Sequence, residues 1–466
     1  MSELILYNTL SRRKEAFTPI EPGKIGLYVC GVTVYDYCHI GHARVLVAFD
    51  VISRFLRHDG WDLTYVRNIT DIDDKILTRA EENAEPYTDL TERFITAMHE
   101  DEHALGVLRP DLEPRATAHI DVIVKMIQTL MDKGYAYRVD NGDVYYRVTR
   151  FEGYGKLTNK DMDQLLAGAR VDVDEIKEDP RDFALWKHAG EGEVGWQTPF
   201  GFGRPGWHIE CSAMTKTCLG DHFDIHGGGP DLPFPHHENE IAQSEAANGC
   251  HYANYWMHAG AVRLDGEKMS KSLGNFFTIR EVLKKYHPEI VRYLLISSHY
   301  RSSINYSEDS LLEARAALTR FYSALRNYTE VPAADKATLA KSEDYQRFVA
   351  AMRDDFNTRV ALAVMFDMVR SLNAADANEQ TQQQVSVLKA MAEILGILQV
   401  APEEFLQGQG DEEGLSNAQI DALVNERIEA KQEKDFARAD AIRTQLTEAG
   451  IVLEDSPEGT RWRRAP

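Results

Sequence analysis

The sequence predicts an α/β fold: a parallel, doubly wound sheet with an inserted segment, followed by an α-helical bundle and a small C-terminal domain. Three observations predict it. A strand–helix–strand pattern opens the chain, apolar and glycine-rich segments return after residue 206, and helical periodicity dominates beyond residue 300. A strand–helix–strand unit is typical of a parallel sheet, because the connecting helix brings the second strand back beside the first. With 466 residues, the chain has room for about three domains.

The opening unit lies between residues 24 and 69. Residues 24–30 (KIGLYVC) and 63–69 (LTYVRNI) are rich in strand-forming residues. Between them, apolar residues repeat with helical spacing, at Val45, Ala48, Phe49, Ile52, Phe55 and Leu56. Gly60 stands where a helix commonly ends on glycine. We therefore expect a strand, a helix that starts near Gly41, and a second, parallel strand.

Changes of pattern divide the rest of the chain. We expect the sheet domain in residues 1–120 and 206–260, an insertion in 121–205, a loop and stem region in 261–310, a helical bundle in 311–400, a linker in 401–416 and a C-terminal domain in 417–466. The bundle is indicated by helical spacing at Leu318, Phe321, Tyr322 and Leu325, and again at Val385, Leu388, Ala392 and Leu395. Residues 401–416 hold five acids, no base, three glycines and one proline, a composition typical of a solvated linker.

Composition excludes several classes of protein. The chain has 52 basic and 74 acidic residues, a net charge of −22, which argues against coating of nucleic acid by bulk positive charge. A shaped nucleic-acid partner bound by local basic patches stays open. We found no apolar run of 18 residues and no basic-then-apolar N-terminus, so we expect no membrane association. Five cysteines without a Cys-x-x-Cys pair favour a reducing, cytoplasmic setting.

Residues 39–42 (His-Ile-Gly-His) stand between the first strand and the start of the helix. The N-terminus of a helix is a natural anion site, because its backbone N–H groups are unpaired and the helix dipole is positive there. His39 and His42 would add donors to a phosphate, and Gly41 would let a nucleotide approach the backbone closely. Two partly exposed structural histidines are the alternative.

Residues 266–272 (GEKMSKS) place Lys268 and Lys271 three apart in a loop with small hydroxyl residues. Such a loop can fold over a polyphosphate and neutralise charge as that charge develops. A solvated surface loop is the alternative.

A third set of residues suggests a metal site. If residues 236–240 are helical, His236 and Glu240 share one face, and Pro235 is well placed to start that helix. Cys30 and Cys211 would complete a tetrahedral zinc site of two thiolates, an imidazole and a carboxylate. His208 with Cys211 is a competing pair. We expect the other cysteines, Cys38, Cys218 and Cys250, to be small core residues.

The segments at 39–42 and 268–272 together resemble the HIGH and KMSKS motifs of class I aminoacyl-tRNA synthetases, letter for letter. Within that class the chain resembles the cysteinyl-tRNA synthetase family. The resembling segments are residues 28–36 (YVCGVTVYD), 206–212 (GWHIECS), 226–240 (HGGGPDLPFPHHENE) and 354–358 (DDFNT). The resemblance implies a Rossmann-like catalytic domain, activation of L-cysteine with MgATP, and transfer of cysteine to the terminal adenosine of tRNA(Cys).

The resemblance also implies site residues. Cys30, Cys211, His236 and Glu240 would bind one Zn²⁺ that holds the substrate thiol; His39, Gly41, His42, Gly229, Asp231, Lys268 and Lys271 would bind ATP, with the two histidines and two lysines catalytic. Thr70 and Trp207 are candidates for the cysteine pocket, although for Trp207 core packing is an alternative. Candidates for anticodon contacts in a C-terminal anticodon-binding domain are Asp440, Asp455, Arg461, Trp462 and Arg463. The acids could instead be ordinary surface residues. A monomer is expected.

Two other functions fit parts of the sequence. A ligase on the same catalytic domain could transfer activated cysteine to a small amine, but such relatives lack the full C-terminal region that follows residue 400 here. A non-catalytic nucleotide- or tRNA-binding protein would not need intact HIGH and KMSKS motifs. The HGGG segment at residues 226–229 resembles the oxyanion-hole loop of lipases, but no Gly-x-Ser-x-Gly nucleophile motif accompanies it.

Overall fold

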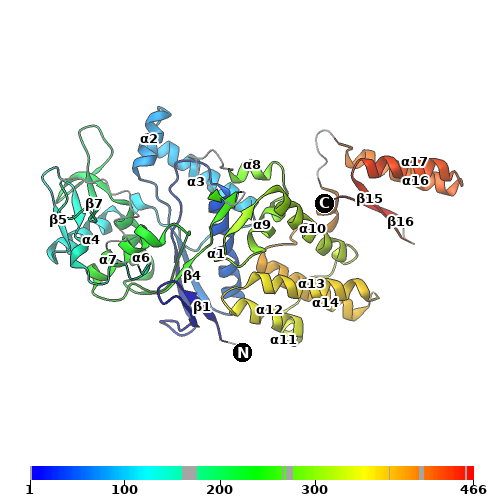
Figure 1. Ribbon diagram of the computed structural model, residues 1–466, viewed down its shortest axis with the longest axis horizontal. Helices are drawn as coiled ribbons and strands as arrows, with labels where there is room; N and C mark the ends of the chain where they lie inside the picture. The colour runs from blue at the N-terminus through cyan, green and yellow to red at the C-terminus, as the bar shows by residue number, and fades with distance from the viewer. Residues whose placement is uncertain are drawn as a thin grey trace. The chain divides into compact units, whose positions relative to one another are not determined.

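The computed structural model describes residues 3–159, 176–264, 267–268, 277–376, 378–408, 414–456 and 459–465 (Figure 1). The chain forms two compact units. The first contains Met1–Lys285, Ser298–Tyr306 and Ala350–Arg359, and the second contains Tyr286–Ser297, Ser307–Val349 and Val360–Pro466.

A four-stranded parallel sheet lies at the centre of the first unit. Its strands are β3 (Lys24–Val29), β4 (Asp62–Arg67), β10 (Phe223–Gly228) and β11 (Ala253–His258), in the order β11-β10-β3-β4. The predicted strand–helix–strand unit is confirmed, with α1 (Ile40–His58) between β3 and β4. The chain runs outward from β3 to β4 and returns on the other side of β3 as β10. In such sheets ligands bind at this reversal point, beyond the carboxyl ends of the two strands.

Further elements surround this sheet. They are the antiparallel pair β1 (Ile5–Asn8) and β2 (Arg13–Ala16), and the helices α2 (Asp74–Glu82), α3 (Tyr87–Ala104), α6 (Trp207–Leu219), η3 (Pro233–His237) and α7 (Glu238–Asn248). In η3 the backbone of Phe234 is extended, so helical geometry becomes regular only after His236. The helix predicted to carry the metal ligands therefore begins with an irregular turn.

The segment between the halves of the parallel sheet contains a sheet of its own. It holds η1 (Ala116–His119), α4 (Ile120–Asp132), β5 (Ala136–Arg138), β6 (Val144–Tyr146), η2 (Val148–Arg150), β7 (Phe183–His188), β8 (Trp196–Thr198) and β9 (Gly201–Pro205). The strands form an antiparallel sheet in the order β5-β6-β7-β9-β8. Beside it lie α4, α6 and α7 (Figure 1), and a shared apolar core that includes Ile127, Trp186 and Ile209 joins them.

The first unit closes with a small mixed sheet. Its strands are β12 (Val262–Leu264), β13 (Glu267–Lys268) and β14 (Ile304–Tyr306), and α8 (Ile279–Leu283) lies between the last two in sequence. Strand β14 lies in the segment 261–310, which was expected to be a loop and stem region, and this strand was not predicted. It pairs with β12 in parallel, and Ile304 and Tyr306 are buried. An apolar–polar–apolar triplet this short carries too little periodicity to be recognised as a strand.

The second unit is mostly helical. Its helices are α9 (Pro288–Ile296), α10 (Glu308–Leu325), α11 (Lys336–Lys341), α12 (Glu343–Arg353), α13 (Thr358–Ala374), α14 (Glu379–Leu395), α15 (Pro402–Gln407), α16 (Asn417–Gln432) and α17 (Phe436–Glu448); residues 350–359 of α12 and α13 belong to the first unit. The chain ends in a hairpin of β15 (Ile451–Ser456) and β16 (Gly459–Arg464).

Helix α15 corrects the prediction that residues 401–416 are a solvated linker. Pro402 occupies the first turn, where proline is favoured, and Leu406 is buried. An acidic sequence of this length therefore still contributes a packed helix. Among the described residues, none of the helices combines the length and apolarity that a membrane span requires.

Candidate active site

A cavity of about 320 Å³ opens at the carboxyl ends of β3 and β10, the reversal point of the sheet. Segments that are distant in sequence line it together. Among its lining residues are Cys30, His39, Gly41, His42, Trp207, Gly229 and Asp231. Five of the seven predicted ATP-binding residues and one predicted metal ligand therefore line one cavity.

The histidines of the HIGH segment cap the helix α1. His39 is the N-cap, its Nδ1 accepts a hydrogen bond from the His42 backbone N–H (3.2 Å), and the His42 Nδ1 accepts one from the His39 N–H (3.3 Å). The two rings stack with centroids 3.7 Å apart. This reciprocal cap fixes both rings at the positive end of the helix, on the wall of the cavity.

Gly41 is required by this stacking. A Cβ at this position would lie 2.7 Å from Cε1 of His39, closer than non-bonded carbons approach. Glycine therefore allows the His39 ring to lie over the first turn.

Cys30, Cys211, His236 and Glu240 meet below the cavity. One potential ligand atom from each lies within 4.8 Å of all the others, and all four residues are buried. The Cys30 Sγ is 3.9 Å from the Cys211 Sγ and 3.4 Å from Glu240 Oε1, and that oxygen is 3.1 Å from His236 Nε2. The structure thus brings together the four residues that the resemblance implied as metal ligands; we call them the outer quartet.

The electrostatics of the outer quartet suit a cation. The hydrogen bond from Cys30, against the cost of burial, lowers the pKa of Cys211 to about 6. Although burial opposes it, the negative charges of Glu240 and Cys211 raise the pKa of His236 to about 10. Against the same cost of burial, His226 and His236 hold the pKa of Glu240 well below its usual value. These pKa shifts all favour a positive charge beside the thiolate and the carboxylate, and a divalent ion would supply it with four direct bonds.

His208 is a neighbour of the outer quartet and not a partner of Cys211 in it. Its Nδ1 lies 2.8 Å from Nδ1 of His236, so it orients that ring from behind. The indole of Trp207 stacks on the His236 ring at 4.3 Å and is 38% exposed. Core packing of Trp207, the alternative left by the sequence, is therefore wrong: the residue lines the cavity.

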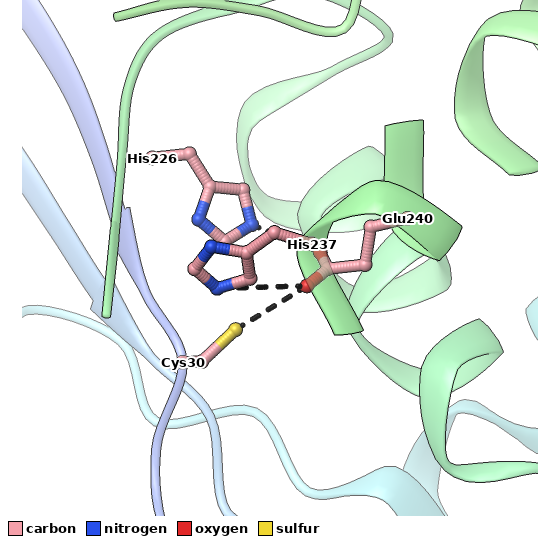
Figure 2. A group of neighbouring side chains, drawn as sticks. All are labelled: Cys30, His226, His237 and Glu240. Atoms are coloured by element: carbon pink, nitrogen blue, oxygen red, sulfur yellow. Dashed lines mark hydrogen bonds and ion pairs between the residues drawn. The ribbon is translucent and has the colours of Figure 1, made fainter. Parts of the chain in front are cut away.

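Three further histidines that sequence analysis did not assign lie on the other side of Glu240. His226 lies within β10 with its Nε2 at 2.9 Å from Glu240 Oε2, and His237 precedes α7; both are fully buried and point toward this carboxylate (Figure 2). His258 lies behind them, with Nε2 at 2.8 Å from His237 Nδ1. The signals in the sequence were the HGGG segment, in which Gly228 leaves room for the His237 ring, and the position of His237 directly after the predicted ligand His236.

The other predicted cavity residues differ in their environment. Asp231 is exposed at the cavity edge, and Gly229 is close to it: a Cβ at 229 would be 3.0 Å from Asp231 Oδ1. Thr70 is buried, accepts a hydrogen bond from Asn68, and is not among the described residues that line the cavity. The backbone of Lys268 forms the end of β13, whereas Lys271 lies outside the described residues.

The predicted anticodon-reading residues fall into two groups. Asp440 is exposed, whereas Arg461 and Arg463 are half-buried and donate to Asn327 and Glu454, respectively. Trp462 is not placed for the predicted anticodon contact: its side chain is 2% exposed and its Nε1 donates to Asp421. The Asp455 carboxylate accepts both ends of the Arg427 guanidinium, which leaves less of it for a base. The side chains of Trp462 and Asp455 therefore stabilise the small C-terminal fold. A two-stranded hairpin needs such contacts with other elements, and the local sequence does not reveal them.

The three cysteines outside the outer quartet behave differently from one another. Cys38 is buried, as expected, and Cys218 is half-buried. Cys250 is exposed, so the expectation of a core residue is wrong there. It follows Gly249, the left-handed cap of α7, at a surface turn.

Three protein-family profiles match the chain. Residues 16–316 match the class I (C) tRNA synthetase catalytic domain, residues 347–399 the DALR domain, and residues 415–463 the cysteinyl-tRNA ligase anticodon-binding domain. Together these matches cover most of the chain.

Curated relatives agree with the profiles. The cysteine–tRNA ligase of Chromohalobacter salexigens is 62% identical over 459 residues, 98% of each chain, and that of Ectopseudomonas mendocina is 61% identical over 465 residues, 99% of each. Among solved structures, a Mycobacterium tuberculosis methionyl-tRNA synthetase with methionyl-adenylate has a TM-score of 0.57 at 16% identity, covering 80% of this chain and 89% of that one, which shows the shared fold. The chain belongs to the cysteine–tRNA ligase family of class I aminoacyl-tRNA synthetases, enzymes that join cysteine to tRNA(Cys).

Proposed function

We propose that the outer quartet binds one Zn²⁺ that takes the thiol of substrate cysteine, and that this bond separates cysteine from serine. The observation that carries the proposal is the convergence of four buried S, N and O ligand atoms within 4.8 Å of one another, below a cavity that Cys30 and Trp207 line. Two thiolates, one imidazole and one carboxylate are a donor set that zinc accepts.

The ion would supply a soft Lewis acid that holds the substrate as a thiolate. Serine offers a harder and far less acidic oxygen to the same place. Shape alone separates side chains this similar by only about 10–200-fold, so a bond that only one of them makes is the stronger criterion. We assign no segment of the chain to editing, in keeping with selection at this single site.

We further propose that the chain first forms cysteinyl-adenylate and then transfers cysteine to a ribose hydroxyl of the terminal adenosine of tRNA(Cys), the 2′-hydroxyl by likeness to its class. The substrate carboxylate attacks the α-phosphate of MgATP, and pyrophosphate leaves. No enzyme nucleophile is needed, because positioning and charge stabilisation suffice. His39 and His42 hold the phosphates at the helix N-terminus, and Lys268 and Lys271 neutralise the departing pyrophosphate.

The remaining assignments are part of the same proposal. Gly229 and Asp231 contact the adenosine, Asp231 through the ribose, and Thr70 and Trp207 shape the cysteine pocket. Asp440, Arg461 and Arg463 contact tRNA, with Trp462 and Asp455 supporting the fold that presents them. We propose that, apart from the segment 401–416, which contains the packed helix α15, the domains follow the boundaries expected above, and that the protein acts as a cytoplasmic monomer.

The zinc assignment is tested by replacing Cys211. A Cys211→Ser chain should lose cysteine-dependent exchange of labelled pyrophosphate into ATP by at least about 100-fold, because a hydroxyl replaces a ligand thiolate. A Cys250→Ser chain, altered at an exposed thiol, should match the unmodified enzyme. Full exchange by Cys211→Ser, together with unchanged rejection of serine, would contradict the proposal.

The lysine assignment is tested separately. A Lys271→Ala enzyme should bind cysteine normally yet form adenylate slowly, because the lysine acts on the leaving group. Lys284→Ala removes an exposed lysine near the end of α8 and serves as the charge-matched control. Adenylate formation at the same rate in both variants would remove Lys271 from the catalytic residues.

A further inference from the structure

A second set of four buried side chains shares two members with the outer quartet. Cys30, His226, His237 and Glu240, the inner quartet, also offer ligand atoms that all lie within 4.8 Å of one another (Figure 2). We propose that the inner quartet is a second site for the same class of divalent ion, mutually exclusive with the outer quartet because Cys30 and Glu240 serve both. This inference rests on the metal site proposed above and adds an alternative position for its ion.

The Nε2 atom of His237 has the hydrogen-bonding environment of a metal ligand. Its Nδ1 is 2.8 Å from His258 Nε2, and the Nδ1 of His258 is 2.9 Å from the Thr9 hydroxyl. When each Nδ1 carries the proton and donates along this chain, the lone pair of His237 Nε2 remains available. No described residue forms a hydrogen bond with this nitrogen, although the side chain is fully buried. Metal-bound histidines typically have this arrangement, with the second nitrogen donating to a neighbour.

Glu240 can serve either quartet with little movement. Its Oε1 is 3.1 Å from His236 Nε2 in the outer quartet and 4.0 Å from His237 Nε2 in the inner one. Its Oε2 is 2.9 Å from His226 Nε2 and accepts the Tyr252 hydroxyl at 3.0 Å. An ion in the inner quartet would replace the hydrogen bond between His226 and Glu240, while Tyr252 keeps the carboxylate in place.

The imidazoles are also held rigidly in position. The His226 ring stacks on Trp256 with centroids 4.5 Å apart and an interplanar angle of 13°. A Cβ on Gly228 would lie 2.8 Å from Cε1 of His237, so glycine makes the space for that ring. A purely structural buried histidine normally pairs its polar atoms, yet His226 Nδ1 and His237 Nε2 have no hydrogen-bond partner among the described residues.

The two quartets differ in softness. The outer quartet has two thiolates, whereas the inner quartet replaces Cys211 and His236 with two imidazoles. Soft ions such as Zn²⁺ and Cd²⁺ therefore favour the outer position, and Ni²⁺ or Co²⁺ is better suited to the inner one. An ion in the inner quartet leaves Cys211 and His236 without metal, while it keeps Cys30, the one member of either quartet among the described residues that line the cavity.

X-ray absorption of the zinc-loaded, full-length Cys211→Ser chain tests the proposal. The inner quartet predicts one sulfur and two imidazole ligands, whereas the remainder of the outer quartet would supply one sulfur and one imidazole. A Cys211→Ser/His237→Gln chain should lose one imidazole ligand and bind zinc at least about 10-fold more weakly. This lower bound is the typical cost of losing a residue that only hydrogen-bonds to a metal ligand. A Cys211→Ser/His251→Gln chain, altered at a surface histidine, should match Cys211→Ser.

The outcomes separate this inference from the metal site itself. One imidazole in Cys211→Ser, or no zinc in that chain while the unmodified protein holds zinc with two sulfurs, overturns the inner quartet alone. No zinc in the unmodified protein overturns both sites. Should Cys211→Ser lack the native circular dichroism spectrum, the unmodified protein loaded with Ni²⁺ replaces it: two imidazoles support the inner quartet, and one imidazole with two sulfurs overturns it.

Discussion

At the scale of single residues, the active site depends on glycines as well as on the histidines that they accommodate. Gly41 lets the His39 ring lie over the first turn of α1, and Gly228 leaves space for the His237 ring. Each glycine allows an imidazole to approach the backbone more closely than a Cβ would permit.

Gly41→Ala should therefore displace His39. We expect cysteine-dependent pyrophosphate exchange to fall by about 100-fold, because small misplacements of positioning groups are costly. The matched control is Gly26→Ala in β3, where a Cβ would meet its neighbours at an ordinary 3.5 Å. The melting temperatures of both variants check that the loss is local; equal exchange rates in the two would show that the His39 ring position does not matter.

Asp101 on α3 makes the stability of the protein depend on pH. Burial, only partly offset by Arg280, raises the pKa of its carboxyl to about 6. The folded chain then binds the proton more tightly than the unfolded chain. The unfolding free energy should thus fall as pH rises from about 4 to about 6, by at most about 3 kcal/mol, and stay lower above that range. Asp101→Asn should remove this decrease in urea titrations at different pH, whereas Glu100→Gln, at an exposed neighbour, should keep it.

At the scale of elements, Asp355 connects segments that are remote in sequence within the first unit. Its buried carboxylate accepts the backbone N–H of Tyr7 in β1 (2.9 Å), the Tyr300 hydroxyl (2.9 Å) and the Arg301 Nε–H (2.8 Å). The carbonyl groups of residues 299, 300 and 302 in turn accept the guanidinium of Arg44 on α1. The helix of the HIGH segment is therefore fastened to the segment that Asp355 holds.

Asp355→Ala should lower the unfolding free energy by about 3 kcal/mol, because removal of one partner leaves buried donors unpaired. The adjacent Asp354 pairs with Lys14 at the surface and is 49% exposed. Asp354→Ala should therefore cost less than about 1 kcal/mol. Urea denaturation of both variants measures the difference; similar losses would mean that Asp355 is not a principal link.

At the scale of the whole molecule, a net charge of −22 repels a polyanion, so a polyanion must be bound by local groups of basic side chains. A tRNA that meets two or more lysine or arginine side chains should bind about 10-fold or more weakly when salt rises from about 50 to about 200 mM. Cysteine-dependent pyrophosphate exchange, which needs no tRNA, should change far less. Measuring the KM for tRNA and the exchange rate over the same salt series separates the two, and a parallel decline of both would contradict this expectation.

Much of the fold follows from local patterns. The strand–helix–strand unit at residues 24–67, the helical periodicity at Leu318 to Leu325 and the capping positions were readable because period and cap chemistry act over a few residues. Strand β14 and helix α15 could not be predicted from local patterns. Each depends on packing against residues that are distant in sequence. The burial of Trp462 could not be predicted from local sequence either, because it depends on contact with Asp421 in helix α16.

The sequence by itself determined the class of enzyme, the HIGH and KMSKS segments and, through family likeness, the four residues of the outer quartet. Tertiary structure alone decided that Cys30, from the end of β3, meets side chains more than 180 positions later along the chain. It also placed His226 and His237 on the far side of the same carboxylate, for which no spacing rule exists. The physical reason is that a parallel sheet brings the ends of remote strands together, so contacts at its reversal point are set by topology and packing.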